Sequence, residues 1–373
     1  MRPVYLDFNA STPIAPEVAE AMGPFLSAGF GNPSSPHWAG RSAREAVDHA
    51  RAQVAALLGC AVAEVIFTSG GTEANNLALK GVFDRRAEGR DHIITTAVEH
   101  PSVLNPCRYL ERHGARLTVL PVDGTGLVDP EAVARAITGR TLLVSVMHAN
   151  NEVGTLQPVA DIARVAHERE VLVHVDAAQS AGKVPVKVDD LGADLLSVAG
   201  HKLYAPKGVG ALYVRSGTVL EPLLHGAGHE GGRRAGTESA LLVTGLGAAC
   251  ALGAAGDVLR LRDRFWALLR EAFGDGVRLN GHPERRLPNT VNVSFVGRDG
   301  AALLARLEGV AATTGSACHA GRTEPSPVLT AMGVPADVAR GAIRFSLGRT
   351  TTDGEIDRVV ELLRRAIGED GRG

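Results

Sequence analysis

The sequence is poor in cysteine and has no strong excess of either charge. Its four cysteines, Cys60, Cys107, Cys250 and Cys318, are far apart and form no CxxC pair, which argues against a disulfide framework and a structural zinc site. The formal net charge of -2 gives no electrostatic reason to expect nucleic acid or a membrane surface as a partner. The first residues lack the apolar core of a signal peptide, and no run approaches a membrane span. We therefore expect a cytoplasmic protein.

The first two thirds of the sequence have the pattern of an α/β domain. A chain of 373 residues with 45% hydrophobic residues is long enough for one large α/β domain and a smaller companion. Short β-rich runs alternate with helix-length stretches, which predicts a mostly parallel, doubly wound sheet whose ligands lie beyond the carboxyl ends of the strands. The seven expected strands are Val65–Thr68, His92–Ala97, Arg116–Val122, Thr141–Met147, Val171–Asp176, Asp194–Ala199 and Val209–Val214.

The last third of the chain differs in pattern. A helical region runs to about Phe273, and a strand-like NTVNVSFV segment follows it. A further strand is expected at Ala342–Leu347, before a final helix that begins with the capping box Thr352-x-x-Glu355. We predict a large domain over residues 15–250. Residues 1–14 and 251–373 are expected to form a small α+β domain that carries the loop around Cys318.

The segment FTSGGTEANN, residues 67–76, has the pattern of a phosphate site. An expected strand ends at Thr68, Gly70 and Gly71 follow, and a helical pattern begins near Thr72. Backbone N–H groups at a helix N-terminus, with glycines that allow close approach, bind phosphate groups. A plain glycine turn capped by Thr72 is the alternative, and this segment by itself does not exclude it.

The segment VLVHVDAAQS, residues 171–180, places Asp176 at the end of a buried strand. A buried carboxylate needs a cationic partner, and the protonated ring nitrogen of pyridoxal 5'-phosphate (PLP) is one. Gln179, three residues further on, is then expected to hydrogen-bond the phenolic oxygen of that ring. Asp176 as a helix N-cap is an open alternative. His174 and Asp176 as metal ligands lack a third ligand, so no metal is expected.

Lysine occurs at five positions, and one of them is in an unusual setting. Lys202 lies in a Gly/Pro-rich turn between two apolar strands, within GHKLYAPKGVG. An amine desolvated in such a place has a lowered pKa, which suits Schiff-base chemistry. The neighbouring His201 is expected to face a phosphate. The other lysines have ordinary settings: Lys80 in a helical pattern, Lys183 and Lys187 beside a surface turn, and Lys207 directly before a strand.

Two further residues are candidates for chemistry near the C-terminus. Cys318 lies among small residues before Ser326-Pro327, a helix N-cap pattern. An exposed thiol there suggests nucleophilic or redox work, whereas Cys60 and Cys250 are expected in the core. Arg344, in AIRFSLGR, is placed by strand alternation to bind a substrate carboxylate, and a structural salt bridge is an equal alternative.

Together these segments resemble the cysteine desulfurases of the class-V aminotransferase group and their close relatives, the selenocysteine lyases. The resemblance runs nearly end to end, and its order and spacing are highly specific. It implies a PLP-dependent fold type I enzyme that converts L-cysteine to L-alanine and transfers the sulfur to Cys318 as a persulfide. The matching segments are YLDFNASTP, GNPSSPHWAGR, FTSGGTEANN, AVEH, MHANNEVGTLQP, HVDAAQ, GHKLYAPKGVGALYV, HGAGHEGGRRAGT, GSAC and IRFSLGR.

The resemblance also implies roles for single residues. Catalysis is assigned to Lys202, Cys318 and His100, with His100 stacked on the cofactor ring. Thr237 matches a phosphate ligand that the family supplies from the neighbouring subunit, so a homodimer is implied. The implied cofactor contacts are Gly71, Thr72, His100, Asp176, Gln179, His201, Lys202 and Thr237, and the implied substrate contacts are Asn151 and Arg344.

Two departures from the family pattern leave alternatives open. Ala199 stands where many members have a serine that binds phosphate, so one phosphate hydrogen bond is in doubt. Cys318 is followed by His319, as in selenocysteine lyases, so L-selenocysteine is a second candidate substrate. A β-lyase that makes pyruvate and a non-catalytic sulfur-assembly scaffold are further alternatives. The expected sulfur acceptor is a protein such as an iron–sulfur scaffold, and the sequence does not identify it.

Overall fold

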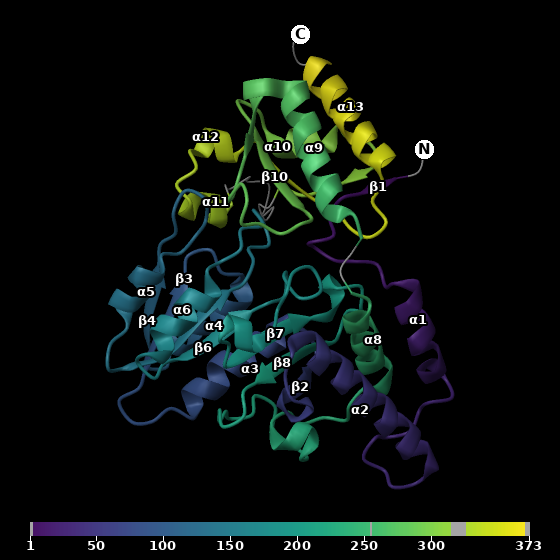
Figure 1. Ribbon diagram of the computed structural model, residues 1–373, viewed down its shortest axis with the longest axis vertical. Helices are drawn as coiled ribbons and strands as arrows, with labels where there is room; N and C mark the ends of the chain where they lie inside the picture. The colour runs from purple at the N-terminus through teal and green to yellow at the C-terminus, as the bar shows by residue number, and fades with distance from the viewer. Residues whose placement is uncertain (1–2, 254–255, 315–325, 370–373) are drawn as a thin grey trace.

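A seven-stranded sheet lies at the centre of the larger part of the molecule (Figure 1). The computed structural model describes residues 3–253, 256–314 and 326–369. The strand order is β2-β8-β7-β6-β5-β3-β4, in which β8 is antiparallel to both neighbours and the other adjacent pairs are parallel. All seven expected strands and the mostly parallel sheet are confirmed. The strands are β2 Val65–Thr68, β3 His92–Thr96, β4 Arg116–Leu120, β5 Thr141–Met147, β6 Leu172–Asp176, β7 Leu195–Ala199 and β8 Gly210–Val214.

Helices cover both faces of this sheet because its side chains alternate between two apolar clusters. In β2, Val65 and Phe67 belong to one cluster and Ile66 to the other. The first cluster also holds the helices α2 and α8, which lie side by side in Figure 1. The helices of this part are α1 Pro16–Met22, α2 Trp38–Leu58, α3 Gly71–Asp84, α4 Pro101–Arg112, α5 Pro130–Ala136, α6 Val159–His167, α7 Val188–Leu191 and α8 Ala240–Ala251.

A second, smaller part of the molecule has its own antiparallel sheet and its own core. The sheet order is β12-β10-β9, and α9 and α13 pack against it in the upper part of Figure 1. The expected capping box is present, since Glu355 N donates to Thr352 Oγ1 and Thr352 N to Glu355 Oε2. The elements are α9 Val258–Phe273, β9 Val277–Leu279, β10 Thr290–Phe295, α10 Gly300–Ala305, β11 Val310–Ala311, α11 Pro327–Ala331, α12 Ala336–Ala339, β12 Ala342–Ser346 and α13 Asp353–Glu369.

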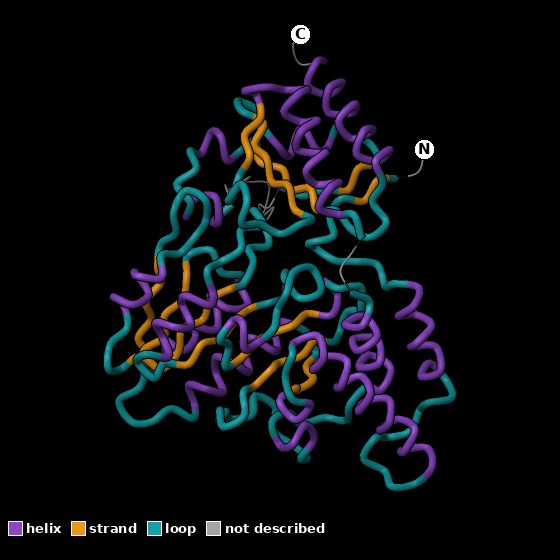
Figure 2. The backbone as a smooth tube through the Cα atoms, viewed as in Figure 1, coloured by secondary structure: helices purple, strands orange, loops and turns teal. Residues whose placement is uncertain are grey.

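The N-terminal segment connects the two parts (Figure 2). Strand β1, Val4–Tyr5, pairs in parallel with β11, and Val4 and Leu6 are buried in the smaller core, whereas Ala15 belongs to the larger one. This agrees with the domain division near residues 14 and 250, which stays a prediction. None of the helices in the described ranges is long and apolar enough to cross a membrane.

The prediction that Cys60 and Cys250 lie in the core holds fully at Cys250 and in part at Cys60. Cys250 is buried in the larger core. Cys60 is only partly buried, because α2 ends at Leu58 and Gly59 leaves the helix in the left-handed conformation, at φ 71°. Cys60 nevertheless packs against the same core as Cys250, at its edge.

Candidate active site

A cavity of about 680 Å³ lies at the carboxyl ends of the parallel strands, where ligands bind in open α/β sheets. It is lined by the loops after β2, β3, β5, β6 and β7, by the N-terminal segment and by Arg344 of β12. Thr237 is exposed and is not among the lining residues, and Cys318 lies outside the described residues. The structure brings the other predicted site residues together: Gly71, Thr72, His100, Asn151, Asp176, Gln179, His201, Lys202 and Arg344.

One end of the cavity has the features of a phosphate site. Helix α3 begins at Gly71, after Gly70 has adopted φ 147° and ψ -179°, a conformation essentially restricted to glycine. His201 Nδ1 is buried and has no hydrogen-bond partner in the described structure. Burial, followed by the charges of Lys202 and Lys207, lowers the pKa of His201 to about 4. A neutral imidazole with an unused nitrogen and the N-terminus of α3 therefore line the same cavity.

The site at Ala199 is tightly packed. A Cβ built on Gly71 would lie 3.1 Å from the Cβ of Ala199. Ala199 thus lies directly against the glycine turn that begins α3, where the sequence predicts a phosphate site.

Asp176 is a buried carboxylate with neutral partners. It is 5% exposed at the end of β6. Its Oδ2 accepts from Asn75 Nδ2 at 2.8 Å and its Oδ1 from the backbone N of Ala178 at 2.9 Å. The second contact closes a turn at residues 176–178, and no helix follows it, so the helix N-cap that the sequence left open is not what Asp176 forms. Because both donors are uncharged, the carboxylate can still pair with a cation in the cavity.

His100 is connected to this carboxylate through two residues that the sequence did not single out. Asn75 Nδ2 also donates to Ser102 Oγ, at 2.9 Å. Ser102 N donates to His100 Nδ1 at 3.1 Å, and Ser102 Oγ lies 2.7 Å from the same nitrogen. Nδ1 is therefore an acceptor, which leaves the proton of the neutral ring on Nε2. Burial lowers the pKa of His100. The sequence feature that could have indicated this network is Asn75 in the motif ANN, a polar side chain that the fold buries.

Lys202 follows β7 in a 3-10 turn, Gly200–Lys202, and its amine reaches the N-terminal segment. Nζ donates to the carbonyl oxygens of Asn9 and Ala10, the latter at 3.0 Å. Burial and the nearby Arg344 guanidinium lower the pKa of Lys202 to about 8. The lowered pKa that the sequence predicted is therefore present.

The sequence placed Lys183 beside a surface turn, and the structure shows that this prediction was incomplete. The Nζ of Lys183 points inward and donates to Gln179 Oε1 at 2.9 Å and to Asn9 Oδ1 at 3.1 Å. Asn9 is fully buried and Gln179 is 5% exposed. The turn at residues 177–183 folds back on the cavity wall, which a local pattern of glycine and proline could not reveal.

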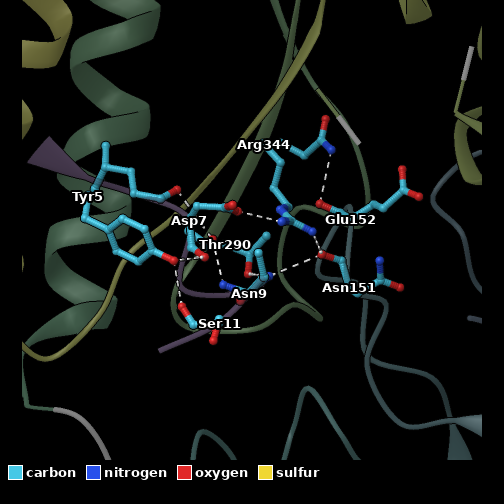
Figure 3. Close-up of polar contacts among 12 residues, drawn as sticks. Tyr5, Asp7, Asn9, Ser11, Asn151, Glu152, Thr290 and Arg344 are labelled. Atoms are coloured by element: carbon cyan, nitrogen blue, oxygen red, sulfur yellow. Dashed lines mark hydrogen bonds and ion pairs between the residues drawn. The ribbon is translucent and has the colours of Figure 1, made fainter. Parts of the chain in front are cut away.

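Arg344 is paired with a carboxylate of the same chain (Figure 3). Its Nη2 donates to Asp7 Oδ1 at 2.7 Å and its Nη1 to the carbonyl oxygen of Asn151 at 2.8 Å. Its Nε is buried and has no partner in the described structure. The structural salt bridge is thus confirmed, and each of the two Nη atoms keeps a second N–H group for a ligand.

Comparisons with known proteins agree with this geometry. The family model described as aminotransferase class-V matches residues 4–359. A cysteine desulfurase IscS of Dictyoglomus turgidum is 46% identical over 98% of this chain and 95% of the relative. One of Methanosarcina thermophila is also 46% identical, over 98% and 92%. The chain belongs to the cysteine desulfurases of the class-V aminotransferase family.

Solved structures support the same assignment. A NifS-like protein superposes with a TM-score of 0.92 at 36% identity, over 98% of this chain and 100% of the other. A structure named SspA in complex with cysteine gives 0.85 at 39% identity, over 94% and 100%. The class-V aminotransferases are PLP enzymes, and PLP is the cofactor of this cysteine desulfurase.

The residues present fit PLP. The buried Asp176 carboxylate, with its two neutral donors, suits a protonated ring nitrogen. The unpartnered His201 nitrogen and the N-terminus of α3 suit a phosphate. Lys202, with its lowered pKa, lines the same cavity. The amine, the carboxylate and the anion site that this cofactor needs therefore surround one space.

Proposed function

We propose that the protein takes sulfur from L-cysteine, releases L-alanine, and carries the sulfur as a persulfide on Cys318. The main support for this proposal is that one cavity is lined by Lys202, Asp176, His100 and Arg344. The role of Cys318 in this proposal rests on the sequence resemblance alone. When bound, PLP supplies an aldehyde that condenses with amines and a ring that accepts the electron pair of a broken Cα–H bond.

The residues of the chain have separate tasks in this proposal. Lys202 holds the cofactor and then, as a free amine, removes the Cα proton of the substrate. A pKa of about 8 makes the unprotonated amine accessible near neutral pH. Asp176 keeps the proton on the ring nitrogen, and Gln179 donates to the ring oxygen. Arg344 and Asn151 orient the substrate carboxylate.

Sulfur transfer is assigned to Cys318. Its thiolate attacks the substrate sulfur, so that a sulfur–sulfur bond forms and the carbon–sulfur bond breaks. The electron pair of the broken bond stays with the carbon fragment, which takes up a proton and leaves as alanine. Cysteine and the enzyme thiol thus give alanine and an enzyme persulfide.

Two substitutions test the division of tasks. Lys202→Ala should abolish turnover and the visible absorbance of the attached cofactor, and borohydride reduction of the native enzyme should label Lys202. Cys318→Ala should keep the coloured cofactor and lose release of sulfide and alanine from L-cysteine. The measurement is sulfide and alanine formed in the presence of a thiol. Full activity of Cys318→Ala would refute the persulfide step.

We further propose that the protein acts as a homodimer and delivers sulfur to an acceptor protein, such as an iron–sulfur scaffold. The exposed position of Thr237, away from the cavity of its own chain, supports a contribution to a neighbouring subunit. Specificity constants for L-cysteine and L-selenocysteine decide which substrate is preferred.

A further inference from the structure

A second lysine lies behind the wall of the active-site cavity and contacts two residues of that wall. Lys183 Nζ donates to Gln179 Oε1 at 2.9 Å and to Asn9 Oδ1 at 3.1 Å. Gln179 Nε2 in turn donates to the carbonyl oxygen of Asn9 at 2.9 Å. Gln179 and Asn9 both line the cavity. The amide of Gln179 is therefore held at both of its ends.

We propose that Lys183 is a positioning residue that fixes the amide of Gln179, so that an N–H group and not the oxygen faces the cofactor. This inference rests on the proposed function, in which Gln179 meets the ring oxygen of PLP. Oε1 of Gln179 accepts from Lys183, and one N–H of Nε2 donates to Asn9. The second N–H of Nε2 therefore remains to donate to a ligand oxygen.

The reverse orientation of the amide is unfavourable at both ends. A flipped Gln179 would place its NH₂ group against the amine of Lys183, so that donor faces donor. It would also place Oε1 against the carbonyl oxygen of Asn9, so that acceptor faces acceptor. Asn9 has little freedom to adapt, because it is fully buried and its side chain also binds Asn289 and Thr290.

The chemical state of Lys183 agrees with this role. Burial, followed by the charges of Lys202 and Arg344, lowers the pKa of Lys183 well below its usual value. Nζ donates to Gln179 Oε1 and to Asn9 Oδ1, which are the two contacts that the proposed role requires. The amine thus serves as a hydrogen-bond donor to both residues of the cavity wall.

The visible absorbance of the bound cofactor reports the proposed contact. A donor to the phenolic oxygen stabilises the oxygen anion and weakens its hold on the proton shared with the attached amine. Loss of that donor should therefore move the titration midpoint of the absorbance to higher pH. A role of Lys183 in folding alone would not move this midpoint.

The test substitution is Lys183→Met, and the matched control is Lys187→Met. Lys187 lies directly before α7, is exposed, and donates to the carbonyl oxygen of Ala56 at 2.6 Å. In Lys183→Met we expect a higher titration midpoint and a PLP affinity about fivefold lower, as for one lost hydrogen bond. Lys187→Met should match the native enzyme. Equal midpoints in the two variants would overturn the proposal.

A double-mutant cycle separates positioning from charge. If Lys183 acts through Gln179, Lys183→Met should have no further effect on the midpoint in a Gln179→Leu background. Additive shifts would mean that Lys183 acts directly by its charge, and would overturn the proposal.

A second variant, Lys183→Gln, keeps the proposal testable if Lys183→Met does not fold. Its shorter amide keeps a donor but reaches these acceptors less well, so we expect an intermediate midpoint. A native midpoint would contradict the proposed role. If borohydride instead labels a residue other than Lys202, the proposed function fails and not only this inference.

Discussion

At the scale of single residues, the pKa of Lys202 reflects a balance of opposing effects. Burial and Arg344 lower it, whereas the carboxylates of Asp7 and Asp176 raise it, and the result is about 8. At pH 7 about 10% of such an amine is unprotonated, against about 0.03% for an ordinary lysine. The folded protein therefore supplies a nucleophilic amine that a surface lysine would not.

This balance predicts how the apoenzyme takes up its cofactor. The rate of attachment of PLP should rise with pH through a midpoint near 8, because the unprotonated amine is the reacting form. Stopped-flow absorbance of apoenzyme mixed with PLP measures it. Arg344→Gln should raise the midpoint and Asp7→Asn should lower it, since these charges act in opposite directions. A rate that still climbs steeply above pH 10 would contradict the assignment.

At the scale of elements, the start of α11 is bonded to the loop after β5. Ser326 caps α11 by accepting from Val328 N and Leu329 N, as the Ser-Pro pattern predicted, and its hydroxyl donates to the Glu152 carboxylate. Burial raises the pKa of Glu152 to about 7, and the Ser326 hydrogen bond opposes this rise. One serine thus serves both the helix cap and a buried carboxyl beside Asn151.

We expect Ser326→Ala to reduce the free energy of unfolding by about 2 kcal/mol at pH 5, from the lost cap and the lost hydrogen bond. The loss should be larger at pH 8. A folded pKa raised above 4.5 means that ionisation of Glu152 costs stability as pH rises through about 7. Without the hydroxyl that cost grows, because the carboxylate loses its donor.

Urea unfolding at the two pH values measures this difference. Thr330→Ala is the matched control, because Thr330 is exposed on the same helix and bonds only within it, to the carbonyl oxygen of Ser326 at 3.0 Å. The control should lose little stability at either pH. An equal loss for Ser326→Ala at pH 5 and pH 8 would contradict the coupling to Glu152.

At the scale of the whole molecule, the active site is assembled from both parts of the chain. Asp176 ends a strand of the large sheet and Lys202 follows another, Arg344 belongs to the small sheet, and Asp7 and Asn9 lie on the N-terminal segment. The ion pair between Asp7 and Arg344 and the contact of Lys202 with Asn9 connect these parts at the cavity. Thr237 is exposed and outside this assembly.

The proposed dimer predicts complementation between two defective subunits. Mixed dimers of Lys202→Ala and Thr237→Val should contain one native site, because the subunit with Lys202 receives Thr237 from its neighbour. That site should bind PLP with native affinity, whereas the Thr237→Val homodimer binds it more weakly after loss of a phosphate hydrogen bond. Absorbance titration of hybrids separated by affinity tags measures this. Hybrids with no native-affinity site would mean that Thr237 acts within its own chain or has no such role.

Local sequence patterns are enough to predict the seven strands, the position of the site at the carboxyl ends of the strands, and the unusual setting of Lys202. These follow from local patterns: apolar runs between turns, a charged residue at the end of a buried strand, and a lysine without a packing role. The resemblance of the sequence to the cysteine desulfurases also gave the family and the cofactor.

Only the tertiary structure decided which side chains meet. The pairing of Asp7 with Arg344, the connection from Asn75 through Ser102 to His100, and the inward position of Lys183 join residues that are distant in sequence or hidden in turns. Such contacts depend on how the strands, the N-terminal segment and the small sheet pack in space. A local pattern carries no information on that packing, because hydrogen bonds between distant segments are specified by the fold as a whole.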